Sequence, residues 1–412
     1  MTIAVEVPGS KSMTQRALII GSLAERPVTI VGALDGDDSR ALVEVLRSLG
    51  VNVGWEGNRV HLVPAPLRSS GGRLDCGNGG TTIRFSAGLS LVCEGPLFLD
   101  GDARMRERTI RSLGLALSAM GVEVQYPSRS GYPPVRLLRT KNPPREVAID
   151  GSQSSQFISS LLLVAPRLPD GLRLSLDGLP VSRPYLEMTM GLMSAAGASV
   201  RWAGDRSIAV DAGNYYREDS LPEISIEPDW SAAAFFLAAG VLLDTDVVIR
   251  NLVPPERSVQ GDAAFGWFVD ELRQDRRHEF DLTDVPDLIA PLSAAALFAS
   301  ESTEIRGAAH TRIKESDRIS VLSTELRKLG AKIEEKEDGM IIHPLKSDPT
   351  SEAVQLDPSD DHRMAMAFGV ISLRLPAIEV LNPGCVSKSF PDFWEVLSSI
   401  RPATSRFGKA GR

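Results

Sequence analysis

Six stretches of the chain begin with polar residues and continue with a long apolar run. They are GSKSMTQRALIIGSLA, GNGGTTIRFSAGLSLV, GSQSSQFISSLLLVA, PDWSAAAFFLAAGVLL, PDLIAPLSAAALFAS and SDDHRMAMAFGVISLR. Each continuation is apolar nearly all round, which is typical of a helix buried inside its domain. Each start carries Ser, Asp, Asn or Gly, residues that cap helices well. The pattern therefore predicts six buried helices.

These stretches recur at nearly regular intervals. Their anchor residues lie about 70 residues apart, with one shorter interval between the fourth and the fifth, and are Ser10, Gly80, Ser154, Asp229, Asp287 and Asp360. Periods this long also occur in solenoids, but buried helices favour closed α/β domains. We therefore expect six α/β units, three in each of two domains, with the division near residues 223–230.

A second pattern lies between these stretches. The segments LRSLGVNVGW, LSAMGVEVQY, MSAAGASVRW and LRKLGAKIEE each combine an amphipathic helix, a glycine and an alternating strand. A glycine just past a helix supplies the left-handed conformation that ends it, so we expect helix ends at Gly50, Gly121, Gly197 and Gly330. The fourth repeat has no such glycine near residues 265–283 and is predicted to be shortened.

The composition is typical of a soluble enzyme. It is 43% hydrophobic and 24% charged, and no apolar run is long enough to cross a membrane. We expect no targeting peptide, because the chain leads directly into TIAVEVPGSKS. Three cysteines without a CxxC pair argue against disulfides and structural zinc and favour a reducing cytoplasm. The net charge of −8 argues against a general nucleic-acid surface.

Cations gather at the starts of the predicted helices and in three motifs outside them. They are Lys11, Arg16, Arg84, Arg104, Arg106, Arg108, Lys314, Arg318, Arg363 and Lys388. Each cluster alone is also typical of a solvated cap or an exposed ion-pair network. Their recurrence at equivalent places in successive repeats favours function instead. Cations that accompany Ser, Asn and Gln, without a metal-ligand cluster, indicate a site for phosphate or carboxylate groups.

Two carboxylates, Asp287 and Glu315, lie among these cations. Proton transfer to and from a strongly anionic substrate requires such a pair. The chain contains no GxxxxGK[ST] sequence, which argues against a P-loop nucleotide site. It also lacks a GxSxG sequence at a strand–turn–helix junction, so an α/β-hydrolase nucleophile is unsupported.

The motifs taken together resemble the 5-enolpyruvylshikimate-3-phosphate synthase family. The matching segments are PGSKSMTQRA, GNGGTTIR, ARMRERTI, GSQSSQF, VSRPY, PDLIAPLSAAAL, RIKESDRI, DDHRMAMAF and GCVSKSFPDF, in the family's order. The resemblance implies transfer of the enolpyruvyl group of phosphoenolpyruvate to the 5-hydroxyl of shikimate 3-phosphate, with release of phosphate. It also implies a two-domain inverted α/β barrel-like fold of six βαβαββ-type repeats, three per domain.

The resemblance also implies domain bounds and partners. The first domain would span residues 13–227, the second residues 1–12 plus 228–400, and residues 401–412 would form a polar tail. The family resemblance implies a monomeric cytoplasmic enzyme of aromatic amino acid biosynthesis that uses neither cofactor nor metal. Its partners would be the two small-molecule substrates, with no nucleic acid and no membrane.

Site residues follow from the same resemblance, position by position. The expected contacts of shikimate 3-phosphate are Lys11, Ser12, Arg16, Ser154, Ser155, Gln156, Ser182, Tyr185, Asp287, His310 and Lys314. The expected contacts of phosphoenolpyruvate are Lys11, Gly80, Arg104, Gln156, Arg318, Arg363 and Lys388. Asp287 would accept the hydroxyl proton, Glu315 would deliver a proton to the methylene carbon, and Lys11 would complete the catalytic group. Gly80 would leave room for the herbicide glyphosate in the phosphoenolpyruvate pocket.

Two positions depart from many relatives. His310 stands where Asn is common, and Phe85 stands where Pro is common and borders the expected phosphoenolpyruvate pocket.

The enzymatic alternative is the enolpyruvyl transferase that acts on UDP-N-acetylglucosamine, whose reactive cysteine has no counterpart in residues 94–126. A non-catalytic sugar-phosphate binding protein and an enzyme that processes RNA ends are further alternatives. Retention of both carboxylates argues against the former, and the acidic net charge argues against the latter.

Overall fold

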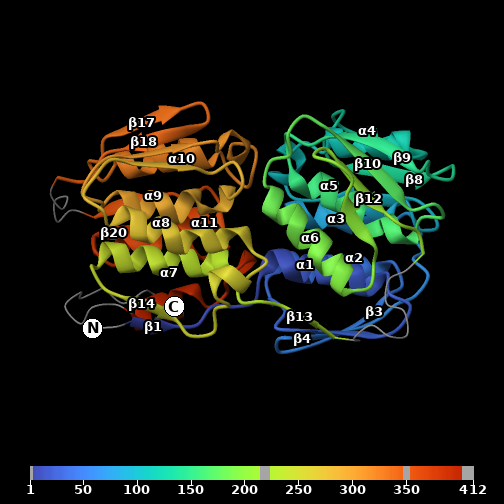
Figure 1. The fold of residues 1–412 in the computed structure, drawn as a ribbon, viewed down its shortest axis with the longest axis horizontal. Helices are drawn as coiled ribbons and strands as arrows, with labels where there is room; N and C mark the ends of the chain where they lie inside the picture. Colours follow the sequence, from blue (N-terminus) through green and yellow to red (C-terminus); the bar gives the residue numbers. More distant parts are fainter. Residues whose placement is uncertain (1–2, 214–222, 347–352, 401–412) are drawn as a thin grey trace. The chain divides into compact units, whose positions relative to one another are not determined.

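A computed structural model describes residues 3–213, 223–346 and 353–400. The chain forms two compact units (Figure 1). The N-terminal unit spans Gly9–Glu227, and the C-terminal unit comprises the residues up to Pro8 and those from Pro228 onward. The predicted polar tail, residues 401–412, lies outside the described residues. No helix in the described part of the chain is long and apolar enough to cross a membrane.

The N-terminal unit contains three repeats, each with two helices and a four-stranded sheet. The first repeat contains α1 (Lys11–Ser22), β2 (Val28–Val31), α2 (Asp37–Ser48), β3 (Asn52–Glu56) and β4 (Arg59–Val63). The second contains β5 (Arg73–Asp75), α3 (Gly80–Leu89), β6 (Leu97–Asp100), α4 (Arg111–Ala119), β7 (Val122–Gln125) and β8 (Val135–Arg139). The third contains β9 (Glu146–Asp150), α5 (Ser155–Val164), β10 (Leu172–Asp177), α6 (Arg183–Ala195), β11 (Val200–Trp202) and β12 (Ser207–Val210).

The C-terminal unit also contains three repeats. Its first and third repeats have fewer strands than the repeats of the N-terminal unit, among the residues that the structure describes. Its first has β1 (Ile3–Val5), α7 (Trp230–Leu242), β14 (Val247–Ile249) and α8 (Phe265–Leu272). Its second has β15 (His278–Asp281), α9 (Ile289–Ala296), β16 (Thr303–Arg306), α10 (Arg318–Arg327), β17 (Ile333–Lys336) and β18 (Gly339–Ile342). Its third has β19 (Val354–Leu356), α11 (His362–Ser372), β20 (Ile378–Val380) and α12 (Phe393–Ser399). The chain passes from α8 directly to β15, so the predicted shortening of the fourth repeat is confirmed.

Four of the six repeats share one sheet topology, whereas the sheets β1–β14 and β19–β20 have two strands each in the part of the chain that the structure describes. In the second repeat β5 and β6 are parallel, and β8 joins β6 to β7 through antiparallel pairs. The sheets β9–β10–β12–β11 and β15–β16–β18–β17 have the same order. The four glycines expected to end helices, Gly50, Gly121, Gly197 and Gly330, all have positive φ. The predicted α/β fold of repeated units is therefore confirmed.

The chain exchanges one strand between the units. β1 pairs in parallel with β14 of the C-terminal unit, whereas β13 (Glu223–Ser225) pairs in parallel with β2 of the N-terminal unit. β13 thus supplies the edge strand that β1 would otherwise give to the first repeat. The chain consequently passes between the units twice, once after Pro8 and once after Glu227.

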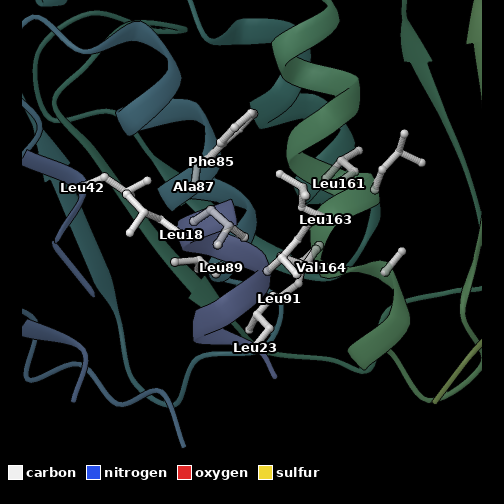
Figure 2. Packing of buried hydrophobic residues seen from close by; sticks show 14 of the residues in the cluster. Leu18, Leu23, Leu42, Phe85, Ala87, Leu89, Leu91, Leu161, Leu163 and Val164 are labelled. Carbon is white, nitrogen blue, oxygen red and sulfur yellow. The ribbon is translucent and has the colours of Figure 1, made fainter. Parts of the chain in front are cut away.

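The alternate helices of each unit form its core. Nearly every residue of α1, α3, α5, α7, α9 and α11 is buried, so the prediction of six buried helices is confirmed. Figure 2 shows the side chains of Leu18, Leu89 and Leu161 among those that fill the space between α1, α3 and α5. Because these helices are apolar on all sides, their polar starts are the part left for chemistry.

Close packing of α3 against α5 depends on Gly88. A Cβ at this position would lie 2.5 Å from both the carbonyl oxygen and the Oγ of Ser160.

We expect Gly88→Ala to lower the free energy of unfolding by about 1–3 kcal/mol, as overpacking in cores does. The matched control is Gly191→Ala in α6, where a Cβ would meet no atom within 4 Å. Since alanine favours helices by about 1 kcal/mol over glycine, the control should be neutral or stabilising. Urea unfolding that ranks the two variants equally would contradict this account.

Candidate active site

Arg16, on the second turn of α1, is a buried cation whose partners are neutral. Its side chain donates to Thr189 Oγ1 at 2.7 Å and to the carbonyl oxygen of Ser12 at 2.8 Å. It also donates to the carbonyl oxygen of Tyr185 at 3.2 Å and to Ser159 Oγ at 3.5 Å. Among the described residues none of its hydrogen bonds reaches a carboxylate. Burial lowers the pKa of Arg16 to about 10, an effect that Tyr185 partly offsets, so the group stays charged at neutral pH.

This uncompensated charge indicates an anion site. A buried cation without an opposite charge is costly, and its cost falls when an anionic ligand binds. The ring of Phe85 lies over the guanidinium, with 5.4 Å between Arg16 Cζ and the ring centroid. Phe85 therefore borders the predicted shikimate 3-phosphate contact Arg16, a placement that the sequence analysis did not anticipate.

The start of α5 holds Gln156 in place. Ser154 caps this helix, and its Oγ accepts the backbone N–H of Gln156 at 3.3 Å. The side-chain oxygen of Gln156 accepts a hydrogen bond from Arg84, whose guanidinium lies over the Phe157 ring at 5.0 Å. Arg84 is thus a buried cation beside a predicted substrate contact. Sequence analysis noted Arg84 as a cation but did not include it among the substrate contacts.

Arg108, rather than Arg104, lies at Gly80. Gly80 is the first residue of α3, and a Cβ there would overlap the Arg108 guanidinium. Arg108 is buried and also donates to Asn78. Arg104 instead pairs with Glu107 at 2.9 Å and keeps 34% of its side chain exposed. The structure therefore places a different arginine of the ARMRERTI motif beside the predicted phosphoenolpyruvate contact Gly80.

The remaining predicted residues of this unit lie at helix starts. Lys11 begins α1, and its Nζ lies 3.4 Å from a carboxylate oxygen of Asp38. Ser155 begins α5 and is buried. Ser182, with φ of 55°, precedes α6, and Tyr185 lies in the first turn of that helix. A non-glycine residue with positive φ is uncommon, so the Ser182 backbone is held in a strained conformation.

In the C-terminal unit Arg318 binds three carboxylates. It begins α10 and is almost fully buried. Its guanidinium donates to Asp361 at 2.8 Å, to Asp287 at 2.8 Å and to Glu315 at 3.0 Å. Burial alone would lower the pKa of Arg318, but the three carboxylates raise it above its ordinary value. The predicted residues Asp287, Glu315 and Arg318 are therefore in direct contact.

Further cations complete this cluster. Arg363 donates to the second oxygen of Asp287 at 2.8 Å, and Lys388 Nζ lies 3.4 Å from Glu315. Burial raises the pKa of Asp287, but Arg363, Arg318 and Lys314 outweigh this effect and hold the pKa well below its ordinary value. Asp287 is thus ionised at neutral pH.

His310 lies beside this cluster, in the turn that precedes α10. Burial and, to a smaller extent, the charge of Lys314 lower the pKa of His310 to about 4. The ring is therefore neutral at pH 7. Its Nε2 atom is buried and has no hydrogen-bond partner among the described residues. A neutral imidazole in this position can donate to or accept from a bound hydroxyl group.

Asp262 is a buried carboxylate of the same region that sequence reasoning missed. It lies in the shortened fourth repeat and accepts a hydrogen bond from Ser231 Oγ. Burial and the nearby charge of Asp287 raise the pKa of Asp262 to about 7, although Arg363 and Ser231 oppose the shift. Asp229 adds a smaller effect in the raising direction.

Comparisons with known proteins show the family of the chain. A model of the EPSP synthase family, described as 3-phosphoshikimate 1-carboxyvinyltransferase, matches residues 1–397. The chain belongs to the EPSP synthase family. It is 36% identical over 416 residues to the 3-phosphoshikimate 1-carboxyvinyltransferase of Methanoculleus marisnigri and 33% identical over 416 residues to that of Vibrio campbellii. Each match covers 96% of this chain and 96% of the relative.

A solved structure supports the fold. EPSP synthase from Acinetobacter baumannii superposes with a TM-score of 0.75 and 23% identity, covering 97% of this chain and 95% of that one. At that identity the similarity shows the fold alone. In this EPSP synthase family member Asp287, Glu315, Arg318, Arg363 and Lys388 are in contact with one another, and their roles in substrate binding stay predictions.

The raised pKa of Asp262 predicts a pH-dependent stability. The folded protein keeps a proton on this carboxyl up to about pH 7, whereas the unfolded chain loses it near pH 4. Stability therefore falls as pH rises through this interval. Asp262→Asn keeps an acceptor for Ser231 and removes the titration, so its stability relative to wild type should rise by a few kcal/mol between pH 4 and pH 8.

Urea unfolding at a series of pH values measures this difference. Asp270→Asn, an exposed change on α8, serves as the control and should show no such trend. A stability difference between Asp262→Asn and wild type that is the same at every pH would contradict the assignment.

Proposed function

We propose that this chain catalyses transfer of the enolpyruvyl group of phosphoenolpyruvate to the 5-hydroxyl of shikimate 3-phosphate, with release of phosphate. The activity is that of 3-phosphoshikimate 1-carboxyvinyltransferase, a step of the shikimate pathway to aromatic amino acids. Family membership over residues 1–397 supports it. The carrying observation is that Asp287 and Glu315 both bind Arg318, so two carboxylates and an anion-binding cation share one buried cluster.

Shikimate 3-phosphate is assigned mainly to the N-terminal unit. Arg16 supplies a full positive charge that no described carboxylate balances, which suits a dianionic phosphate. Ser154, Ser155 and Ser182 supply hydroxyl groups beside helix starts, where backbone N–H groups also favour anions. We assign Ser12, Gln156 and Tyr185 to the same ligand. From the C-terminal unit, the proposal adds Asp287, His310 and Lys314.

Phosphoenolpyruvate is assigned to cations of both units. Arg318, Arg363 and Lys388 form the C-terminal set, which the carboxylates of the cluster hold in place. In the N-terminal unit we assign Lys11, Gly80 and Gln156. We also assign Arg108, because its guanidinium lies at Gly80 while Arg104 is partly exposed and paired with Glu107. An alanine at position 80 would therefore displace Arg108 as well as crowd glyphosate.

The charges suggest how binding prepares the base. In the ligand-free protein Asp287 is a weak base, since two guanidinium groups hold its pKa low. Phosphoenolpyruvate would compete for Arg318 and Arg363 and leave Asp287 with less stabilisation of its ionised form. The basicity of Asp287 would then increase only when substrate is bound. A general base works best when its pKa approaches the working pH.

The reaction would proceed by addition and elimination. Glu315 in its protonated form gives a proton to the methylene carbon of phosphoenolpyruvate, while the 5-hydroxyl oxygen bonds to the adjacent carbon and Asp287 takes the hydroxyl proton. Glu315, now ionised, then takes a proton from the new methyl group, which restores the double bond as the bond to phosphate breaks and phosphate leaves. Lys11, Arg318 and Lys388 would stabilise the charge on the departing phosphate.

Three remaining properties belong to the same proposal. We propose that the enzyme is a cytoplasmic monomer that needs neither cofactor nor metal. Support for a reducing compartment comes from Cys76, Cys93 and Cys385, which are free thiols. Burial raises the pKa of Cys93 to about 11, so this thiol is poorly reactive at neutral pH.

Phosphate release tests the function. The wild-type chain should release phosphate from phosphoenolpyruvate only when shikimate 3-phosphate is present. Glu315→Gln should slow turnover by about 10²–10⁴-fold, the usual cost of losing a general acid or base, while calorimetry shows shikimate 3-phosphate binding little changed. Glu325→Gln, a buried change on α10 whose carboxylate pairs with Lys328, is the matched control and should keep near wild-type turnover.

Two results would count against these assignments. Wild-type protein that releases no phosphate with both substrates would contradict the function. A Glu315→Gln variant as active as the Glu325→Gln control would contradict the role of Glu315 and leave the function standing.

A further inference from the structure

The N-terminal unit has a cavity of about 580 Å³ at the end of its core opposite to the substrate contacts. Its wall includes Leu23 and Glu25 just after α1, Val92 and Glu94 just after α3, and Arg167 just after α5. Figure 2 shows Leu23, Leu91 and Val164 gathered where these three helices end. The volume falls in the range of about 300–1,000 Å³ that small-molecule sites occupy.

Two arginine side chains, Arg139 and Arg167, lie in the cavity wall. Arg139, at the end of β8, is half-buried, and its side chain makes no hydrogen bond or ion pair with any residue that the structure describes. Arg167 lies 3.9 Å from Glu25, which is too long for a hydrogen bond. A carboxylate can accept hydrogen bonds from two guanidinium groups that line one cavity.

The same cavity also offers sites for a positive charge. Glu25 and Glu94 lie in its wall, and each already attracts a cation: Glu94 accepts a hydrogen bond from Arg68 at 3.0 Å, and Glu25 lies 3.9 Å from Arg167. The C-terminal ends of α1, α3 and α5 lead into it, and helix C-termini carry partial negative charge. An anion without a positive charge of its own would be repelled by these glutamates and helix C-termini. A ligand with both a carboxylate and an ammonium group would match both features.

Apolar side chains supply the remaining surface. Leu23, Leu67 and Val92 line the cavity together with Pro64 and Pro66. An apolar group of a ligand would gain free energy by leaving water against these side chains. Carboxylate, ammonium and apolar group together define an amino acid with an apolar side chain.

We propose that this cavity is an effector site for a free amino acid with an apolar side chain. The carboxylate binds Arg139 and Arg167, the ammonium group lies near Glu94 and the helix C-termini, and the side chain packs against Leu23, Leu67 and Val92. The helices α1, α3 and α5 join this cavity to Lys11, Gly80 and Gln156, about 15 Å away along each helix. Occupancy of the cavity therefore alters the kinetic constants of the reaction; this regulatory part rests on the proposed function, whereas the binding part does not.

Calorimetry on the full chain without substrates tests the binding. The probes are L-leucine, L-methionine and L-phenylalanine, with 4-methylpentanoate and isopentylamine as the analogues of leucine that lack one charged group. At least one amino acid should bind saturably below 10 mM, and each analogue should bind at least tenfold more weakly than leucine.

Arg139→Gln should weaken amino-acid binding at least tenfold. Arg136→Gln, an exposed change on the same strand, is the matched control and should bind within twofold of wild type.

The outcomes separate the parts of the proposal. No saturable binding of any amino acid, or equal affinity in Arg139→Gln and Arg136→Gln, would overturn the site. Tight binding of 4-methylpentanoate would overturn the amino-acid assignment in favour of a simple carboxylate. Thermal unfolding of both variants without ligand shows whether each is folded. Amino-acid binding that leaves the KM values and kcat of phosphate release unchanged, in an enzyme that does turn over, would overturn the regulatory part alone.

Discussion

Burial of positive charge is the constraint on which the candidate site depends. Six apolar helices leave their polar starts as places for chemistry, and guanidinium groups at those starts are removed from water. Arg318 meets this constraint with three carboxylates inside its own unit. Arg16 has only hydroxyl and carbonyl oxygens among the described residues. The first arginine is neutralised within the fold, and the second is left for an anionic ligand.

This difference also explains the acid–base chemistry. Asp287 and Glu315 both accept hydrogen bonds from Arg318, and Arg363 and Arg318 hold the pKa of Asp287 well below its ordinary value. An anionic substrate that binds the same cations changes the environment of both carboxylates. Binding and proton transfer are then coupled through one buried cluster, since the group that recognises the anion also sets the basicity of Asp287. Asp262 extends the cluster into the fourth repeat, where burial keeps a proton on a carboxyl.

The repeat architecture could be predicted because it follows from patterns along the chain. Apolar runs without a polar face predicted the buried helices, and four glycines predicted the helix ends. The exchange of β1 and β13 was implied by the family resemblance.

Arg16 and Arg318 could be predicted as site residues because they lie in motifs at helix starts. The position of Arg108 at Gly80 could not be predicted, because it depends on the turn Met105–Glu107, which directs the Arg104 and Arg108 side chains differently. Asp262 and the cavity gave no signal, since both result from packing between distant segments.

Substitution of Arg318 and of Arg16 tests the claim that the first is neutralised within the fold and the second is left for an anionic ligand. Arg318→Met leaves three carboxylates without a shared cation and should lower the free energy of unfolding by about 3–5 kcal/mol. Arg16→Met should cost much less, because Thr189 still bonds Ser159 and the Tyr185 carbonyl. Shikimate 3-phosphate should stabilise wild type in a concentration-dependent manner and should not stabilise Arg16→Met. Equal destabilisation by the two substitutions, or full stabilisation of Arg16→Met by shikimate 3-phosphate, would contradict the account.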